Sequence, residues 1–334
     1  MSIETKIIKK IRRKLDHQWS DLRSALGTNK KLFWKARGAR MLVYHGICKS
    51  NHTRFNSIFL TEKIFEEHLQ FYAKYFHIIS LDNYYNKNFN DLKFNICITF
   101  DDGFANNHKY VLPLLDKYKI PATFFVTAIR DAGYDILWND LLCLAQKYGP
   151  ATFQLFDEKF YKDNSEKYVS GNTKTLLKDF LMKDDFYKKA ELIKILDPYI
   201  DKYKKKEEDY WLQMTKEEIK ELSSSPLATI GSHGYYHNDL SQVSINDASN
   251  EMRLSQQWLE NITGKPINAI AFPYGNYTRH VITEAKKLGF TQLLATDFLF
   301  HEDHTDNALR ERLTINPYIS INNQMIAIID GKYK

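Results

Sequence analysis

The chain has 334 residues, of which 43% are hydrophobic and 26% carry a formal charge. These proportions exclude disordered, collagen-like and coiled-coil proteins. No apolar run approaches the roughly 18 residues that a membrane-spanning helix requires. The formal net charge is +6, but the first 40 residues hold 12 basic and three acidic side chains, so the remainder is net negative. A negative body argues against nucleic acid as a partner, and we expect none.

Residues 1–39 are predicted to form a basic amphipathic helical segment. Their apolar side chains recur every three or four positions and so share one side of a helix: Ile7, Ile11, Leu15, Trp19, Leu22 and Leu26. Six lysines and arginines lie between residues 6 and 14. Two interpretations stay open. Residues 1–30 contact an anionic membrane surface, or the helix packs on its own domain or a second subunit.

The N-terminal residues also bear on location. Residues 1–30 lack the apolar core of a secretory signal, and the three cysteines are too widely spaced for a disulfide framework. We therefore expect a cytoplasmic protein. On the membrane interpretation it would be held peripherally at the inner face.

Residues 40–334 form the body, in which short apolar runs alternate with helical patterns. Strands are expected at residues 41–44, 77–81, 95–100, 122–127, 228–232, 268–272, 291–296 and 313–315. Helices are expected around residues 65–76, 113–119, 251–262 and 283–288. This alternation predicts an α/β fold with a largely parallel sheet, either open or closed into a barrel.

The pattern changes over residues 134–225, where lysine, aspartate and glutamate are frequent. Residues 138–148 and 186–199 have the apolar spacing of helices, and Thr215 begins a capping-box sequence. We predict a helical insertion between two strands. Trp138, Trp211 and Trp258 are expected in the core, although the two in the insertion could instead stack on a sugar ring.

A pair of carboxylates follows the strand that ends at Phe100. Asp101, Asp102 and Gly103 come directly after it, and the carboxyl ends of parallel strands form the active site in α/β folds. Adjacent carboxylates repel, so neither stays ionised without a cation or a shared proton. A metal would take one as a ligand and leave the other as a base. Taken alone, an ordinary Asp-Gly turn explains the motif equally well.

Two further motifs follow strand ends. His233 and His237 have the i, i+4 spacing that lets two imidazoles share a metal, although such a pair alone is weak evidence. With one aspartate they would make an open metal site. Phe272, Pro273, Tyr274 and Gly275 form a rigid turn that can present a backbone N–H inward, and alone an ordinary turn is favoured.

Together and in this order, the three motifs resemble those of the polysaccharide deacetylases of carbohydrate esterase family four, the NodB-homology fold. The resemblance extends to the entry strand at residues 41–47 and to residues 121–126, and it covers residues 40–130 and 225–320. It implies a distorted (β/α) barrel, usually of seven strands, to which the helical insertion and the N-terminal helix are added.

The resemblance also implies roles for individual residues. Asp101 would be the general base, and the backbone N–H of Tyr274 would help to form the oxyanion hole. One divalent metal ion, usually zinc and sometimes cobalt or another ion, would be bound by Asp102, His233 and His237. The substrate is expected to lie against Pro273, Gly275 and Phe104.

One departure concerns the residue that orients the base. The family's third motif usually begins with an arginine, and this chain has Ala271 there. Arg279 or Arg312 could supply the missing guanidinium from another loop.

A second departure concerns the general acid, which is usually a histidine near the C-terminus. No histidine follows His304. His45, His301 and His304 are the candidates, and we favour His45 because it ends the entry strand and should face the same edge of the sheet.

These features predict a metal-dependent hydrolase that removes N-acetyl groups from an amino-sugar glycan or from a lipid- or nucleotide-linked sugar precursor. A bound metal lowers the pKa of water to about 7 and polarises the acetyl carbonyl. Two alternatives stay open. One is a hydrolase of the same fold that acts on another ester or non-peptide C–N bond. The other is a catalytically impaired glycan-binding protein, suggested by the two departures.

Overall fold

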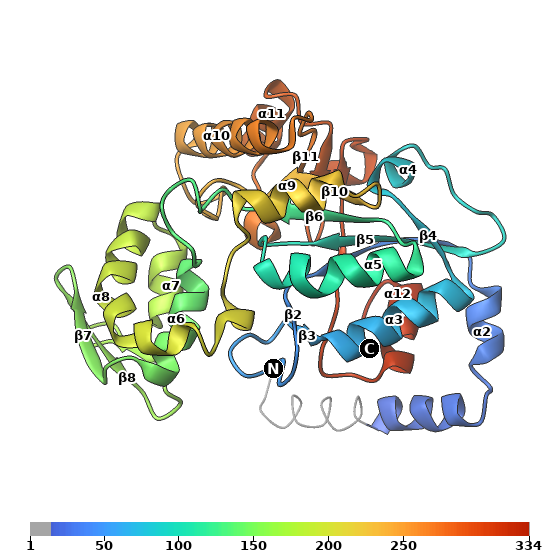
Figure 1. Cartoon of the computed structure of the whole chain (residues 1–334), viewed down its shortest axis with the longest axis horizontal. Helices are drawn as coiled ribbons and strands as arrows, with labels where there is room; N and C mark the ends of the chain where they lie inside the picture. Colours follow the sequence, from blue (N-terminus) through green and yellow to red (C-terminus); the bar gives the residue numbers. More distant parts are fainter. Residues whose placement is uncertain (1–14, 334) are drawn as a thin grey trace.

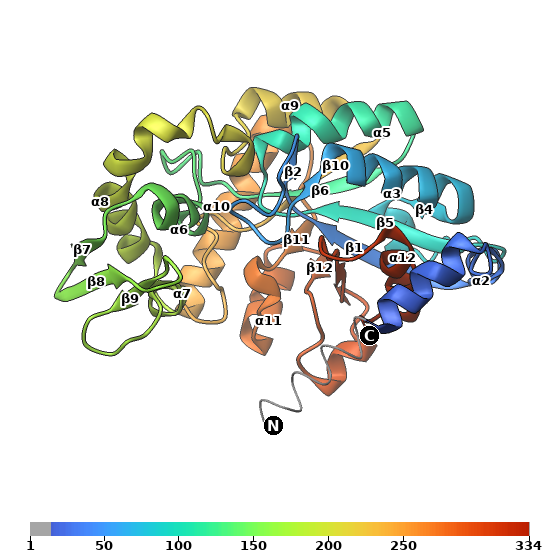
Figure 2. The ribbon, with the colours of Figure 1, turned by 90° about the horizontal axis from the view of Figure 1, so that it is seen from below.

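The body is built on a curled parallel β-sheet flanked by helices (Figures 1 and 2). The computed structural model describes residues 15–333. The strands of the main sheet are β1 (Gly38–Tyr44), β4 (His77–Ile79), β5 (Phe94–Phe100), β6 (Ala122–Val126), β10 (Ala228–Ser232), β11 (Ala269–Ala271), β12 (Gln292–Leu294), β13 (Leu309–Arg310) and β14 (Leu313–Thr314). A separate pair is formed by β2 (Ile47–Cys48) and β3 (Leu60–Thr61).

The order of the strands makes the sheet a distorted, incompletely closed barrel. Eight strands follow the path β13-β12-β11-β10-β6-β5-β1-β14, and β4 pairs with β5 beside it. Every pairing in this sheet is parallel. The two edge strands, β13 and β14, are separated by only two residues of the chain, so the curled sheet brings its edges together. The predicted fold class is confirmed.

Helices precede, connect and follow these strands. They are α2 (Lys30–Lys35), α3 (Glu62–Tyr75), α4 (Leu81–Tyr85), α5 (Leu112–Tyr118), α9 (Lys216–Ser224), α10 (Ile245–Thr263), α11 (Arg279–Lys287) and α12 (Ile321–Asp330). The predicted glycine stop after α10 is confirmed, since Gly264 ends that helix in the left-handed conformation. The start of α10 was predicted six residues too late, because Ser244 caps the helix well before its apolar residues become regular.

The central strands explain why the sheet forms. All seven residues of β5 are buried, and β5 pairs with β1 along its whole length. A strand covered on both faces is expected to be mostly apolar, and five of its seven residues are. The two polar ones, Asn95 and Thr99, donate side-chain hydrogen bonds to backbone carbonyls of β1. This burial places whatever follows Phe100 in the interior as well.

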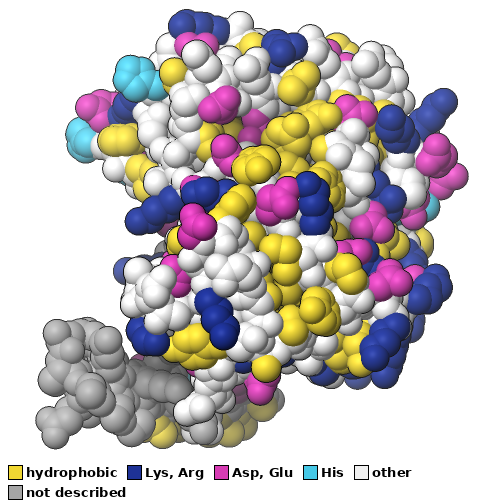
Figure 3. All heavy atoms as spheres, turned by 90° about the vertical axis from the view of Figure 1, so that its left-hand side faces the viewer, with side chains coloured by type: hydrophobic (Ala, Val, Ile, Leu, Met, Phe, Trp, Pro, Cys, Tyr) yellow, Lys and Arg dark blue, Asp and Glu magenta, His cyan; other side chains and the backbone are white. Residues whose placement is uncertain are grey.

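The insertion has a hydrophobic core of its own. It contains α6 (Trp138–Tyr148), α7 (Leu177–Met182), α8 (Phe186–Lys204) and an antiparallel sheet of β7 (Thr152–Leu155), β8 (Glu158–Lys162) and β9 (Tyr168–Ser170). The prediction of a mostly helical insertion missed this sheet, because its lysine- and glutamate-rich sequence favours helix. The outer face of the insertion intersperses basic, acidic and hydrophobic side chains (Figure 3).

The predicted core tryptophans are confirmed. Trp138, Trp211 and Trp258 are 0%, 4% and 7% exposed. The first two pack in the insertion core and the third in the main core.

The N-terminal helix turns its polar side toward the body. Residues 15–25 are helical, and Asp21 accepts hydrogen bonds from Ser320 and Asn323 at the start of α12. The apolar stripe points outward instead, with exposures of 50–72% for four side chains: Leu15, Trp19, Leu22 and Leu26. Ile7 and Ile11 lie outside the described residues. No helix within residues 15–333 is both long and apolar enough to cross a membrane.

Gly231, next to the end of β10, has no room for a side chain. A Cβ there would lie 2.5 Å from a ring carbon of Phe125 and 3.2 Å from the Ala269 carbonyl oxygen. We expect Gly231→Ala to lower the free energy of unfolding by about 1–3 kcal/mol, as overpacking does in other cores. Chemical denaturation measures this. The double variant Gly231→Ala, Phe125→Leu should lose less free energy of unfolding than the two single variants lose together, because the smaller side chain relieves the contact. A loss equal to the sum of the two would contradict a clash between these side chains.

Candidate metal centre and active site

A cavity of about 320 Å³ opens at the carboxyl ends of the parallel strands. Four strand ends contribute to its wall: His45 follows β1, Asp101 and Asp102 follow β5, His233 follows β10, and Tyr274 follows β11. Parallel strands present their carboxyl ends at one edge, so residues far apart in the sequence converge there.

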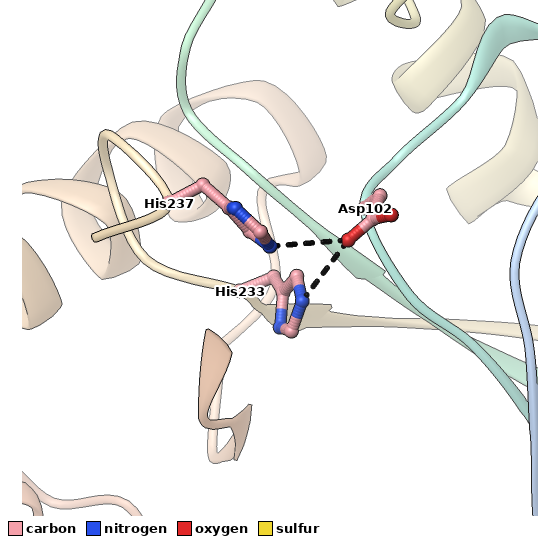
Figure 4. Close-up of side chains that lie close together, drawn as sticks. All are labelled: Asp102, His233 and His237. Carbon is pink, nitrogen blue, oxygen red and sulfur yellow. Dashed lines mark ion pairs between the residues drawn. The ribbon is translucent and has the colours of Figure 1, made fainter. Parts of the chain in front are cut away.

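Asp102, His233 and His237 point toward one another in this cavity (Figure 4). Nε2 of His233 lies 3.3 Å and Nε2 of His237 lies 3.2 Å from the same oxygen, Oδ1 of Asp102. In a tetrahedral site with bonds of about 2.0–2.2 Å, neighbouring ligand atoms are roughly 3.3–3.5 Å apart. The donor types and these two separations therefore fit a divalent metal ion. Within residues 15–333 no second group of three such side chains has this arrangement.

A hydrogen bond orients the His233 ring. Its Nδ1 lies 2.8 Å from the carbonyl oxygen of Ala271, so the ring donates its Nδ1–H there and keeps Nε2 toward Asp102. Metal-binding histidines usually donate their second nitrogen to such an acceptor. Ala271 thus supports the candidate metal site through its backbone.

The charges of the cluster depend on one another. Burial raises the pKa of Asp102, but hydrogen bonds from the two histidines outweigh it and hold that pKa well below its ordinary value. Burial also lowers the pKa of His233, yet the charges of Asp101 and Asp102 outweigh it and raise the pKa. For His237 the effect of burial exceeds that of the hydrogen bond and charge of Asp102, so the pKa of His237 is lowered. A metal ion that binds here competes with protons for the ring nitrogens of the two histidines.

Asp101 has a separate partner in Arg312. The guanidinium donates two hydrogen bonds to the two carboxylate oxygens, at 2.7 and 2.8 Å, and a third at 3.0 Å to Thr99. Burial alone would raise the pKa of Asp101, but Arg312 outweighs it and the pKa is lowered. Asp101 is therefore an ionised carboxylate held in one orientation.

Arg312 stands in for the arginine that is missing at Ala271. It lies between β13 and β14, at the seam where the two edges of the sheet meet, and its side chain is fully buried. Arg279, the other candidate, pairs with Glu302 and Asp303 instead.

Three residues of the site have a left-handed backbone: Asp102 (φ 75°), His237 (φ 59°) and Tyr274 (φ 61°). This conformation costs roughly 1–3 kcal/mol in residues other than glycine and concentrates at functional sites. Gly275 is also left-handed, and a Cβ there would lie 2.2 Å from Oγ1 of Thr296. The turn after β11 therefore requires glycine at this position.

The other predicted site residues divide into two groups. His45, Tyr274 and Gly275 line the cavity. Phe104 does not, because it is fully buried and its ring packs edge-on against that of Phe59, with the ring centroids 4.8 Å apart. Pro273 is buried beside the cavity rather than in its wall.

The two late histidines form no part of the cavity wall. His301 and His304 lie on a short 3₁₀ helix (His301–Thr305), where His304 packs against Phe298. His45 is the histidine among the three candidates that lines the cavity. Its Nδ1 is buried without a hydrogen-bond partner among the described residues.

The insertion forms part of the cavity wall, but not through Trp138 or Trp211, the two residues that the sequence offered for stacking on a sugar ring. Asn139 and Cys143 of α6 and Lys178 of α7 line it, together with Asn56 from the loop after β2. The contacts themselves join distant segments and have no sequence pattern.

Comparison with known proteins agrees with this geometry. The family model for polysaccharide deacetylase matches residues 90–159 and 184–293, together more than half of the chain. The chain belongs to the polysaccharide deacetylase family. The predicted family and enzyme class, a sugar N-deacetylase, are confirmed. No curated protein compared with the chain matches it by sequence.

Solved structures of low sequence identity share the fold. The Streptococcus pyogenes deacetylase PplD, solved with acetate, aligns with a TM-score of 0.57 at 17% identity, over 87% of this chain and 97% of that one. A Bacillus cereus polysaccharide deacetylase aligns with a TM-score of 0.54 at 19% identity, over 87% of this chain and 68% of that one. A de-N-acetylase from Aggregatibacter actinomycetemcomitans aligns with a TM-score of 0.52 at 13% identity, over 85% and 97%.

Removing the guanidinium of Arg312 should destabilise the fold. We expect Arg312→Met to lower the free energy of unfolding by about 3–5 kcal/mol, because Asp101 would remain as a buried charge without its partner. Chemical denaturation gives the value. Adding Asp101→Asn should recover part of the loss.

The matched control is Lys117, whose ion pair with Glu66 lies on the surface. Lys117→Met should change the free energy of unfolding by at most about 1 kcal/mol. Equal losses for Arg312→Met and Lys117→Met would contradict a special role for the buried pair.

Proposed function

We propose that the chain is a metal-dependent N-deacetylase that acts on an amino-sugar glycan or a sugar precursor. The observation that carries this proposal is the pair of adjacent carboxylates with separate partners. Asp102 shares a cluster with His233 and His237, whereas Asp101 is ionised, oriented by Arg312 and free of that cluster. A ligand and a base are both needed for metal-assisted amide hydrolysis.

The metal ligands are Asp102 and the two histidines, whose donor set suits zinc and also cobalt. The chemistry that a divalent ion supplies when bound is a lower pKa for water and a polarised acetyl carbonyl.

Asp101 accepts the proton of the attacking water. Each of its oxygens already accepts one hydrogen bond from Arg312 and keeps a further lone pair for this proton. The water oxygen bonds to the acetyl carbon, and the carbonyl oxygen becomes an oxyanion. The Tyr274 backbone N–H, which has no backbone acceptor among the described residues, donates to that oxyanion.

His45 donates the proton that the leaving nitrogen needs. The C–N bond breaks, acetate leaves, and the sugar keeps a free amine. Burial lowers the pKa of His45, and the charges of Asp102 and Asp101 oppose this, so the protonated acid is present mainly on the acidic side of neutral pH.

The first test measures acetate release by zinc- or cobalt-loaded protein from N-acetylated polymers, lipid-linked sugars and nucleotide sugars. Asp101→Asn should lower kcat about 10²–10⁴-fold while one metal ion per chain stays bound. Asp102→Ala should lose both the metal and the activity, as measured by elemental analysis. Metal-loaded protein that releases acetate from no acceptor would contradict the proposal.

The role of His45 has a pH signature. A general acid must be protonated, so the wild-type rate should fall as pH rises through the pKa of His45. His45→Gln should be slow at every pH and should lack this alkaline fall. A His45→Gln profile that retains the wild-type alkaline limb would assign the acid to another group.

The exposed stripe at the N-terminus supports a second part of the proposal, namely peripheral contact with an anionic membrane. Four apolar side chains of one helix side point away from the body, and Lys30 and Lys31 follow them at the surface. Apolar insertion and basic attraction together favour such a surface. The proposed place of action is the inner face of a membrane, where lipid- or nucleotide-linked precursors would be met.

Vesicle sedimentation tests this contact. The full chain should bind vesicles of phosphatidylglycerol and phosphatidylcholine, less at high salt, and Trp19→Ser with Leu22→Ser should reduce binding about 10-fold or more. Leu92→Ser, at an equally exposed leucine elsewhere, should have no effect. Unchanged binding after deletion of residues 1–38 would contradict membrane contact.

A further inference from the structure

The two histidines of the candidate metal centre are held in different ways. Nδ1 of His233 lies 2.8 Å from the carbonyl oxygen of Ala271, and this hydrogen bond fixes the rotation of the ring. His237 points its Nε2 toward Asp102 (Figure 4), but its Nδ1 is buried without a hydrogen-bond partner among the described residues. The position of the His237 ring therefore depends on its packing against Tyr274 and on the backbone that carries it.

A single carboxyl oxygen of α10 holds that backbone. His237 has the left-handed conformation, which persists only where the surrounding structure enforces it. The residues on either side of it, Tyr236 and Asn238, both donate their backbone N–H to Oε1 of Glu251, at 3.1 and 3.0 Å. The loop also leaves room for this oxygen, since a Cβ at Gly234 would lie 2.9 Å from it. Glu251 thus fixes the chain immediately before and after the predicted metal ligand.

A buried lysine of the insertion is bonded to the same loop. The side-chain amide of Asn238 bridges two charged groups: its Nδ2 donates to Oε2 of Glu251 at 3.0 Å, and its Oδ1 accepts from Nζ of Lys189 at 2.6 Å. Lys189 lies on α8 and also donates to the carbonyl oxygen of Asp184 at 2.8 Å. Lys189, Glu251 and Asn238 are 0%, 3% and 4% exposed. "Glu251 network" denotes these three residues below.

We propose that the residues of the Glu251 network are positioning residues that set the affinity of the candidate centre for its metal ion. The insertion would then contribute to metal binding through Lys189 without supplying a ligand. This inference rests on the proposed function, in which His237 is a metal ligand, and it names what holds that ligand in place.

The charges of the network explain why a lysine is needed. Burial raises the pKa of Glu251, and the hydrogen bonds from Asn238 and Tyr236 and the charge of Lys189 oppose this. Burial lowers the pKa of Lys189 to about 8, and the charge of Glu251 opposes this, so the ammonium group is mostly protonated at neutral pH. An apolar side chain at position 189 would remove this positive charge and leave the Asn238 oxygen without its donor. Both changes weaken the hold on the backbone around His237.

The network joins the insertion core to the metal centre. Nζ of Lys189 lies 5.5 Å from the centroid of the Trp138 ring, which belongs to that core. Groups anchored on packed helices place a site more sharply than groups on a loop alone. Residues that orient metal ligands without touching the ion typically change metal affinity 10–100-fold when they are replaced. We expect an effect of this size here.

Zinc affinity tests the network without turnover. Metal-free, full-length protein is titrated with zinc in competition with a chelator of known affinity. Lys189→Met and Asn238→Ala should each raise the zinc Kd about 10–100-fold. Asn238→Ala keeps both charged side chains, so it tests the network even if Lys189→Met fails to fold. Lys194→Met removes a lysine of the same helix whose ion pair with Glu191 lies at the surface, and it should keep the wild-type Kd.

Leu196→Ala separates positioning from stability. Leu196 is a fully buried residue of α8 in the insertion core, and its truncation should lower the melting temperature. Measured at a temperature where each variant is folded, Leu196→Ala should still bind zinc with the wild-type Kd. A rise in Kd equal to that of Lys189→Met would overturn the inference, because loss of stability alone would then explain the effect.

Failure of the inference and failure of the proposed function give different results. If the wild type binds zinc and both Lys189→Met and Asn238→Ala bind it equally well, the Glu251 network has no positioning role, while the proposed function stands. If the wild type binds no divalent ion, the proposed metal centre fails and the inference fails with it.

Discussion

The structure depends on one electrostatic constraint, the burial of two adjacent carboxylates at the end of β5. Asp101 and Asp102 are each 4% exposed, and neither can stay ionised there without a positive partner. The fold supplies a different partner for each. Arg312, at the seam of the curled sheet, pairs with Asp101, and the histidines after β10 converge on Asp102. This division gives two neighbouring residues of one type separate environments, which the proposed mechanism uses as a base and a metal ligand.

The same edge of the molecule also concentrates local strain. Asp102, His237 and Tyr274 adopt left-handed backbone conformations. This strain costs stability, and the surrounding cores of the barrel and the insertion offset that cost. Residues of the strand ends and of the insertion meet in one cavity there.

Much of this could be predicted from the sequence where the cause is local. Strands such as Phe94–Phe100 are visible as short, mostly apolar runs, and the motifs directly after them mark the edge of the sheet where the cavity opens. Arg312 and Asp101 are 211 positions apart, and such a contact has no periodic sequence pattern. The sequence could therefore offer Arg312 only as one of two candidate partners for Asp101, the other being Arg279. Phe104 was predicted to contact the substrate because it follows the Asp101-Asp102 motif in the sequence. The turn at Gly103 directs its side chain into the core instead. The sheet of the insertion was hidden by a composition that favours helix.

The most direct test of the account is the first coordination shell of the metal, observed by X-ray absorption spectroscopy of zinc-loaded protein together with a crystal structure. The account predicts one ion per chain, bound by an oxygen of Asp102 and by Nε2 of His233 and His237, while Asp101 remains paired with Arg312. An ion that also binds Asp101, or that lies away from these three side chains, would contradict it.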